Sequence, residues 1–294
     1  MDDWRNRLIH LHSCRGVTWK LLYYLLKKDP DLKLIYTYTL PQLQKTFQLT
    51  DQRAKALYHD LHAYPPNNLI HQYEKQQIIP ITILDSNYPP TLKTIHDPPF
   101  VLYVKGKIDY LFNSNCIAVI GTRRPSNEGS KKVYHLVGPL IKEDWTIVSG
   151  LAEGIDTLAH KAAIFYNGKT ISVLGSGFHH IYPKKNEALF LEMSKKNCVI
   201  SEYPPHTSAR KWHFPARNRI ISGLSQGVIV VEAKEKSGSL ITADQALEQG
   251  RDVFAVPGSI FSDTSKGTNR LIQEGAKLIL NSHDLLEELP RFHE

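Results

Sequence analysis

Basic residues occur in pairs at three positions that follow strand-like, apolar runs of the sequence. Arginine presents a planar fork of donors that fits phosphate oxygens, and lysine adds a point charge. We therefore predict that these positions bind phosphate, with solvated surface charge as the alternative that each pair alone leaves open. The three pairs are Arg123 and Arg124, Lys184 and Lys185, and Arg217 and Arg219.

The run 214–233 carries the most information about such a ligand. Pro215 would open a helix whose first turn holds two arginines. Proline is common at the first helical position, but the positive end of the helix dipole favours anions over cations. A bound phosphate would resolve this arrangement. Arg217 could instead serve the fold by pairing with Glu202 or Glu232.

Small residues stand where the predicted strands end. Ser149 and Gly150 close one strand, and Gly121 and Gly175 close two others. Glycine lets a backbone approach a ligand closely, and successive backbone N–H groups favour an anion. In a doubly wound sheet, ligands bind outside the carboxyl ends of the strands. We predict one phosphate-binding cleft at that edge, with plain strand-to-helix turns as the alternative for these glycines.

Motifs for nucleotide cofactors and common catalytic sites are missing from the sequence. The first turn is G-T-R-R-P-S rather than G-x-G-x-x-G, and no G-x-x-x-x-G-K-[ST], G-x-S-x-G or metal-type His/Cys spacing occurs. Glu153 and Asp156 flank a turn and fit a helix start better than an acid and base pair. His160 fits a packed or surface residue better than a base. We expect no catalytic residue, no cofactor and no metal.

The positive charge of the chain is concentrated. The 294 residues carry a formal net charge of +7, and positions 178–219 hold eight Lys/Arg against three Asp/Glu. Aromatic residues such as Tyr182, Trp212 and Phe214 are interleaved with them. Basic groups next to aromatic faces suit a single nucleic acid strand, which offers both phosphates and unstacked bases. Aromatic core residues are the alternative interpretation.

Two regions differ in their hydrophobic pattern. Residues 1–73 have helical spacing, with one helix that Pro30 ends and another that Thr50 or Asp51 caps, so we predict a small all-helical domain. Residues 74–294 alternate strand-like runs with helix-compatible stretches, which favours an α/β domain with a doubly wound, mostly parallel sheet. The predicted strands are 116–121, 145–150, 170–175, 198–203, 227–233, 252–258 and 277–280.

The three cysteines and the hydropathy indicate in which compartment of the cell the protein lies. Cys14, Cys116 and Cys198 have no metal-type spacing, and the last two open apolar runs, where a thiol acts as a small hydrophobe. No apolar run reaches the roughly 18 residues of a membrane span, and the N-terminus lacks the apolar core of a signal peptide. We expect a reduced, cytoplasmic protein without membrane insertion.

Several motifs, in a fixed order, resemble those of the DNA-processing protein A (DprA, also called Smf) family. The resemblance is close over about residues 75–282 and looser over the helical N-terminus. The motifs are GTRRPS, SGLAEGIDTLAH, SVLGSG with YPKKN, SEYPP, FPARNRIISGLS with VIVVEA, SGSLITADQALEQGR, VFAVPGS and GTNRLIQEGA.

The resemblance implies an extended Rossmann-like fold without known catalysis, preceded by a sterile-alpha-motif-like (SAM-like) helical domain. It implies a recombination mediator that protects incoming single-stranded DNA during natural transformation, displaces single-strand-binding protein and loads RecA. The family's DNA pocket uses the arginine of the GTRR turn and the lysine of the YPK turn, which match Arg123, with Arg124, and Lys184. The predicted DNA-binding residues are Gly121, Arg123, Arg124, Ser149, Gly150, Gly175, Lys184, Lys185, Arg217 and Asn218.

The resemblance also implies a homodimer, with dimer and RecA contacts after the sixth of these strands, at Asn269, Ile272, Gln273 and Leu278. The chain departs from many members because it stops after the helix SHDLLEELPR, so we expect no C-terminal winged-helix domain. Of the helix-hairpin-helix glycines that some members carry near the N-terminus, only Gly16 is present. This favours a protein-contact or scaffolding role for the helical domain.

Two other function classes stay open. The enzymatic alternative is a Rossmann-type nucleotide phosphoribohydrolase of the lysine-decarboxylase-like group. Its PGG-x-GT-x-x-E signature places a glutamate near the glycosidic bond, whereas the third position after Thr268 is Leu271, so the general acid/base is missing. A protein-interaction scaffold that holds no DNA is the third hypothesis, for residues 1–73.

Overall fold

The computed structural model describes residues 2–289, which divide into two compact units. The first unit extends to residue 86 and includes 99–103. The second comprises 87–98 and continues from 104. The predicted domain boundary after residue 73 lies inside a helix of the first unit, Pro66–Lys75.

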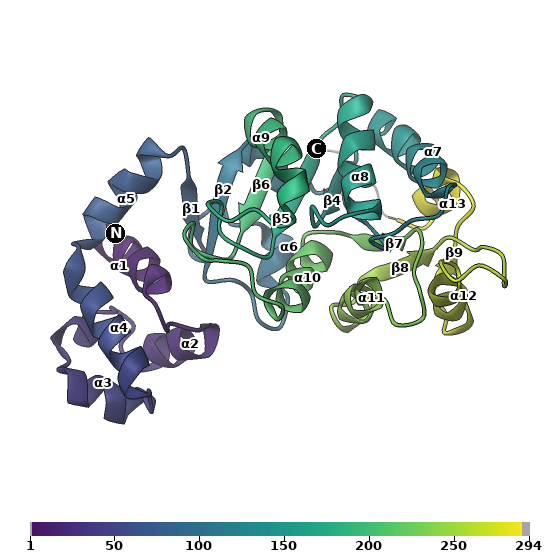
Figure 1. Ribbon diagram of the computed structural model, residues 1–294. Coiled ribbons are helices and arrows are strands. Elements are labelled where there is room, and N and C mark those ends of the chain that lie inside the picture. The colour runs from purple at the N-terminus through teal and green to yellow at the C-terminus, as the bar shows by residue number, and fades with distance from the viewer. Residues whose placement is uncertain (1, 290–294) are drawn as a thin grey trace. The chain divides into compact units, whose positions relative to one another are not determined.

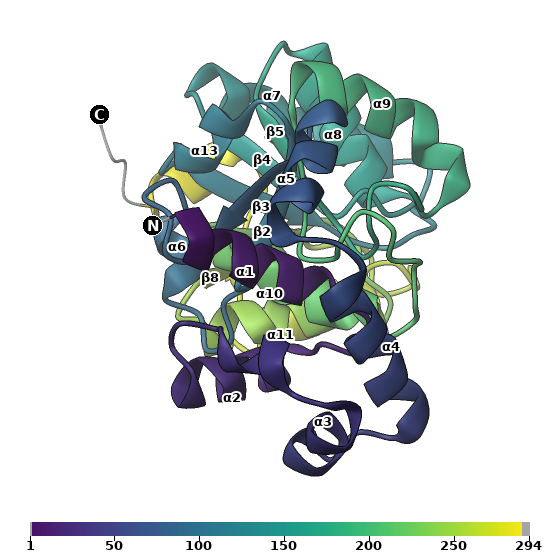
Figure 2. The ribbon, with the colours of Figure 1, turned by 90° about the vertical axis from the view of Figure 1, so that its left-hand side faces the viewer.

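The first unit is built mainly from helices. Its elements are α1 (Asp2–Ser13), α2 (Trp19–Lys28), η1 (Leu34–Thr37), α3 (Leu40–Phe47), α4 (Asp51–Ala63), α5 (Pro66–Lys75) and β1 (Ile79–Thr82). Thr50 caps α4 by accepting a hydrogen bond from the backbone N–H of Arg53 (3.4 Å), and α2 ends at Asp29, just before Pro30. α1 packs against α5, and α3 packs against α4 (Figures 1 and 2).

The second unit contains an α/β sheet. Its strands are the last part of β2 (Val101–Gly106), then β3 (Cys116–Ile120), β4 (Thr146–Ser149), β5 (Thr170–Leu174), β6 (Cys198–Ser201), β7 (Gly227–Val230), β8 (Asp252–Ala255) and β9 (Lys277–Leu278). They pair in the order β2-β6-β5-β4-β3-β7-β8-β9, and every pair from β6 to β9 is parallel. The predicted mostly parallel α/β fold is confirmed, although each predicted strand ends earlier because its last residues form the turn that follows.

Helices cover both faces of this sheet (Figure 1). One face carries α7 (Gly129–Lys142), α8 (Ile155–Phe165) and α9 (Glu187–Lys196), and the other carries α10 (His213–Gly223), α11 (Gly238–Glu248) and α12 (Lys266–Gln273). Because both faces are covered, the strands are apolar throughout. Side chains of β3, β4, β7 and β8 form one hydrophobic core with α7, α8 and α13 (Ser282–Leu286). The short elements are α6 (Pro90–Lys93), η2 (Ile108–Phe112), η3 (Lys184–Asn186) and α13 (Ser282–Leu286).

The sheet has one point at which the direction of winding reverses. β3 lies between β4 and β7, so the chain winds outward from β3 to β6 and then returns to the other side of β3. Ligand sites of doubly wound folds lie outside the carboxyl ends of strands near such a point. Such a site would therefore involve the loops after β3, β4, β5 and β7.

None of the helices among residues 2–289 is both long enough and apolar enough to cross a membrane.

Candidate functional site

A pocket of about 200 Å³ opens at the carboxyl ends of β3, β4 and β5. This is below the roughly 300–1,000 Å³ of sites for drug-sized ligands, so the pocket suits a phosphate group or part of a nucleotide better than a dinucleotide. It brings together four of the predicted site residues. The lining consists of Arg123, Arg124, Gly150, Ala152, Glu153, Tyr182, Pro183, Phe214 and Arg217.

Arg217 is a buried cation in the wall of this pocket, with only 4% of its surface exposed. Its Nη1 donates hydrogen bonds to the carbonyl oxygens of Gly150 (2.6 Å) and Val173, and its Nε donates to Oδ1 of Asn218 (3.2 Å). Arg217 thus holds the ends of β4 and β5 through their carbonyl groups. The predicted site residue Asn218 orients this guanidinium.

The charge of Arg217 has no ion-pair partner within the described part of the chain. Burial lowers the pKa of its guanidinium, and the nearby charge of Asp156 opposes that shift. The Asp156 carboxylate accepts a hydrogen bond from the backbone N–H of Gly150 (3.1 Å), and burial raises the pKa of this carboxyl. Asp156 offsets part of the cost of burying this charge without forming an ion pair, so an anion in the pocket would stabilise the arrangement further.

Three more cations stand at or near the rim. Arg123 and Arg124 are exposed, and within residues 2–289 neither forms an ion pair. Lys184 is also exposed and follows a lining residue without lining the pocket itself. Lys185 differs, because its Nζ lies 2.5 Å from a carboxylate oxygen of Glu153, which neutralises it locally. The rim therefore presents two arginines and one lysine to a ligand.

Two glycines allow the loops to approach one another. Gly154 has φ +77°, and a Cβ there would lie 2.3 Å from the carbonyl oxygen of Thr122, so the loops after β3 and β4 meet backbone to backbone. The N–H of Ile155 donates to the same carbonyl (3.1 Å). At Gly150 a Cβ would lie 2.4 Å from Nη1 of Arg217, so any side chain there would displace the guanidinium.

The turn that carries the two lysines is fixed to the loop after β4 by Asn186. This buried side chain donates from Nδ2 to the carbonyl of Leu151 (2.8 Å) and to Oγ1 of Thr157 (2.8 Å). Sequence reasoning did not single out Asn186, although it closes the YPKKN motif. Its amide is what places η3 beside the pocket.

Three predicted site residues hold the loops and strands around the pocket in place. The Ser149 hydroxyl is buried and donates to the carbonyl of Val119 (2.7 Å). The carbonyl of Gly175 is 3.2 Å from Nδ1 of His213, which fixes the start of α10. A Cβ at Gly121 would lie 2.7 Å from the backbone carbonyl oxygen of Glu232, which follows β7. None of these three lines the pocket.

The helix α10 begins two residues earlier than predicted. The N–H of Ala216 donates to the carbonyl of Trp212 (3.4 Å), so the helix starts at His213 and Pro215 takes its third position. Proline is tolerated there because the first four N–H groups of a helix have no intrahelical acceptor. Arg217 therefore lies in the second turn, and the predicted pair of arginines in the first turn is wrong.

Arg219 serves the fold rather than the pocket. It is buried, its Nε lies 2.9 Å from Oδ2 of Asp97, and its Nη2 lies 2.7 Å from Oε1 of Glu202. Burial would lower the pKa of Arg219, but the two carboxylates outweigh it and raise that pKa. The expected pairing of Arg217 with Glu202 is thus wrong, because Arg219 occupies that carboxylate.

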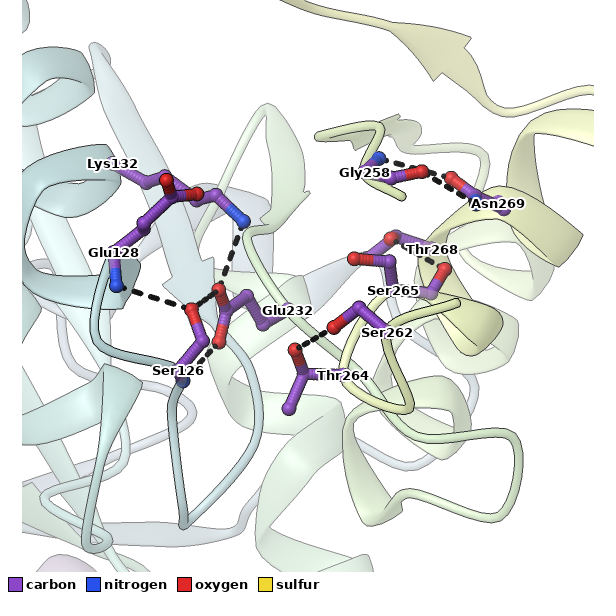
Figure 3. Close-up of polar contacts among 10 residues, drawn as sticks. All are labelled: Ser126, Glu128, Lys132, Glu232, Gly258, Ser262, Thr264, Ser265, Thr268 and Asn269. Carbon is purple, nitrogen blue, oxygen red and sulfur yellow. Dashed lines mark hydrogen bonds and ion pairs between the residues drawn. The ribbon is translucent and has the colours of Figure 1, made fainter. Parts of the chain in front are cut away.

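Glu232 follows β7, and its side chain contacts the loop after β3 and the first turn of α7 (Figure 3). Its carboxylate accepts hydrogen bonds from the backbone N–H (2.8 Å) and hydroxyl (2.6 Å) of Ser126 and pairs with Nζ of Lys132 (2.9 Å). Burial alone would raise the pKa of Glu232, but these bonds lower it. The expected pairing of Arg217 with Glu232 is also wrong, and the place next to the start of α7 holds the chain's own anion.

The four residues predicted for dimer and RecA contacts lie on or near α12 and β9. The Asn269 side chain is used within the chain: it accepts from the N–H of Gly258 (3.1 Å) and donates to its carbonyl (2.9 Å) (Figure 3). Ile272 is partly buried, whereas Gln273 and Leu278 are exposed. Leu278 belongs to β9, which is the last strand of the sheet.

Sequence reasoning missed five residues that line the pocket. Two of them, Tyr182 and Phe214, belong to the aromatic residues noted among the basic ones, and their rings lie 5.4 Å apart. The other three are Ala152, Glu153 and Pro183, whose types carry no signal for phosphate. Within the described residues, no group of three or more His, Cys, Asp and Glu side chains could hold a metal ion.

Comparisons with known proteins agree on one family. The family described as DNA recombination-mediator protein A matches residues 80–290. The DNA processing protein DprA of Bacillus subtilis is 48% identical over 266 residues, which cover 90% of this chain and 88% of that protein. The structure of DNA processing protein A from Streptococcus pneumoniae superposes with a TM-score of 0.82 at 39% identity, covering 98% of this chain and 99% of the other.

A second solved structure, of DNA processing protein A from Helicobacter pylori, was described for its single-stranded DNA binding mode. It has a TM-score of 0.66 and 31% identity, and it covers 72% of this chain and 95% of its own.

Proposed function

Because the chain belongs to the DNA recombination-mediator protein A family, we propose that it binds single-stranded DNA through backbone phosphates in the pocket at the ends of β3, β4 and β5. The observation that carries this proposal is the buried guanidinium of Arg217, which has no ion-pair partner among residues 2–289 and shares the pocket with Arg123 and Arg124. The single-stranded DNA binding mode described for the Helicobacter pylori relative supports it.

Phosphate contacts position a strand without reading its sequence. The site therefore suits a protein that holds any incoming strand. We propose that the bound strand is protected, freed of single-strand-binding protein and passed to RecA during natural transformation, in the cytoplasm. In this account the chain is a mediator and not a catalyst. The helical N-terminal part would contact proteins rather than DNA.

The same family membership leads us to propose a homodimer. β9 is the last strand of the sheet in the described part of the chain, and the nearby Ile272, Gln273 and Leu278 offer apolar and polar side chains for dimer or RecA contacts. Asn269 would contribute indirectly, by bracing Gly258 and the loop before α12. An edge strand with an exposed leucine is a template for pairing with another chain.

Charge reversal at the rim tests the DNA proposal. In a fluorescence-anisotropy titration with labelled oligo-dT, we expect Arg123→Glu and Lys184→Glu each to weaken binding by at least tenfold, for every base composition, because phosphates are contacted. Lys142→Glu is the matched control, since this exposed lysine ends α7 at the opposite edge of the sheet and should bind as the wild type does. If Arg123→Glu and Lys184→Glu both bind with wild-type affinity, the site is elsewhere.

A further inference from the structure

One large aromatic side chain beside the pocket is exposed without an evident structural reason. Trp212 has 64% of its surface exposed, although it stands next to the first residue of α10. Exposed indole groups are unfavourable in water, and tryptophan is enriched where a partner covers it. Trp212 lies outside the lining of the pocket and was not predicted as a site residue.

Two basic residues directly precede Trp212 in the sequence. The guanidinium carbon of Arg210 lies 5.3 Å from the centre of the Trp212 ring, and Lys211 between them is exposed. Neither basic residue forms an ion pair within the described residues. A guanidinium within about 6 Å of an indole centroid makes a cation–π contact, and the same guanidinium can pair with a phosphate. A partner with flat rings and negative charge fits this surface better than an apolar protein face.

The backbone below the indole is fixed. The ring of His213 meets that of Trp212 edge to face at 5.9 Å and stacks on Tyr203 at 4.0 Å. Nδ1 of His213 lies 3.2 Å from the carbonyl oxygen of Gly175, and the His213 ring is buried. Trp212 therefore stands on a rigid support, so little conformational entropy is lost when a ligand stacks on it.

Trp212 also lies close to the proposed phosphate site. It precedes Phe214 by two residues, so the two α-carbons are at most about 7 Å apart. Phe214 lines the pocket together with Tyr182. A strand whose phosphates enter the pocket would therefore pass within reach of the indole.

We propose that Trp212, with Arg210 beside its ring, is a stacking platform for a nucleobase of the single strand whose phosphates occupy the pocket. This inference rests on the proposed function of that pocket. Base stacking on an aromatic residue contributes about 1–3 kcal/mol, which corresponds to about 5- to 150-fold in affinity. It would add binding energy without sequence preference, since every base has a π face.

Oligonucleotides with and without bases separate stacking from phosphate contacts. We would titrate the full chain with oligo-dT and with an abasic oligonucleotide of the same length, at one salt concentration. We expect Trp212→Ala to lose about fivefold or more on oligo-dT and less than twofold on the abasic strand. Trp212→Phe should retain part of the affinity for oligo-dT, and its intrinsic fluorescence should be quenched less by DNA than that of the wild type.

Phe165→Ala is the matched control, because Phe165 is equally exposed but ends α8 at the other edge of the sheet. The inference is overturned if Trp212→Ala binds oligo-dT as the wild type does, or if it loses equally on both strands. Arg123→Glu distinguishes this failure from failure of the proposed function. If Arg123→Glu still weakens binding to both strands, the pocket stands and only the stacking platform is wrong.

Discussion

At the scale of single residues, Gly150 determines whether Arg217 can keep its place. A methyl group at Gly150 would displace the guanidinium, which would lose hydrogen bonds to two strand-end carbonyls. We expect Gly150→Ala to lower the free energy of unfolding by about 1–3 kcal/mol, because a buried charged donor loses its partners. Single-stranded DNA binding should weaken as well. Urea unfolding and an anisotropy titration measure the two effects.

Gly238 is the matched control for this substitution. It opens α11, and a Cβ there would meet nothing within 4 Å. Gly238→Ala should leave DNA binding unchanged and should be neutral or stabilise by up to about 1 kcal/mol. Wild-type stability and affinity in Gly150→Ala would show that the Arg217 guanidinium is not constrained as described.

His160 makes the stability of the chain depend on pH. The Thr170 hydroxyl donates to the carbonyl of Ile147 (2.8 Å), so Nδ1 of His160 donates to that hydroxyl (2.7 Å). Nε2 is buried without a hydrogen-bond partner among the described residues, and burial lowers the pKa of His160 to about 3 from 6.5. The unfolded chain therefore binds more protons between these two values, and stability falls as pH decreases through that window.

We expect the urea midpoint to drop more between pH 7.5 and 5 in the wild type than in His160→Gln, which cannot be protonated. The variant should be less stable at pH 7.5, because the glutamine amide packs less well. An identical pH dependence in both proteins would mean that another group is responsible.

Residue types alone indicated part of the candidate site. Arg123 and Arg124 could be predicted because both are arginines at the end of a strand. The role of Arg217 could not, since its acceptors are the carbonyls of Gly150 and Val173, far away in the sequence. Backbone carbonyl acceptors cannot be read from the types of side chains in a sequence. The carboxylates of Glu202 and Glu232 can be read from it, and they suggested ion pairs with Arg217 that the structure does not contain.

At the scale of elements, the edge strand β9 carries the proposed dimer. Leu278 has 47% of its surface exposed on this strand, which among residues 2–289 pairs only with β8. We expect Leu278→Asp to convert the dimer to a monomer, because a charge on an edge strand prevents pairing with a second chain. Sedimentation equilibrium measures the change, and DNA affinity per chain in the pocket should be kept.

Leu247→Asp is the control, since Leu247 is similarly exposed but lies on α11. It should leave the mass in solution unchanged. A dimer that persists in Leu278→Asp would place the interface on another surface.

The strands of the second unit could be predicted well, and their ends could not. Burial on both faces makes each strand apolar, which the sequence shows directly. At the carboxyl end, residues such as Val231 and Val256 still look like strand residues although they follow β7 and β8. The start of α10 escaped prediction for a similar reason: a backbone hydrogen bond from Ala216 to the carbonyl of Trp212, rather than a residue type, begins that helix.

At the scale of the whole molecule, sheet topology joins charges that are far apart in the sequence. The loops that carry Arg123, Arg217 and the two lysines are connected to different strands. Because those strands are parallel, the loops meet at the carboxyl ends of the sheet. That parallel arrangement was expected from the alternation of strands and helices. The contact of Glu232 with Ser126 and Lys132 was not predicted, because it depends on a loop conformation.

The salt dependence of single-stranded DNA binding measures how many phosphates the cations of the pocket neutralise. For a single strand, log K falls with log salt by about 0.7 for each phosphate that a cation neutralises. We expect the slope for oligo-dT to become shallower by about 0.7 in Arg123→Ala and by about 1.4 in the Arg123→Ala/Arg124→Ala double variant, with weaker binding in both. A slope and affinity equal to those of the wild type in the double variant would contradict the assignment of phosphates to this pocket.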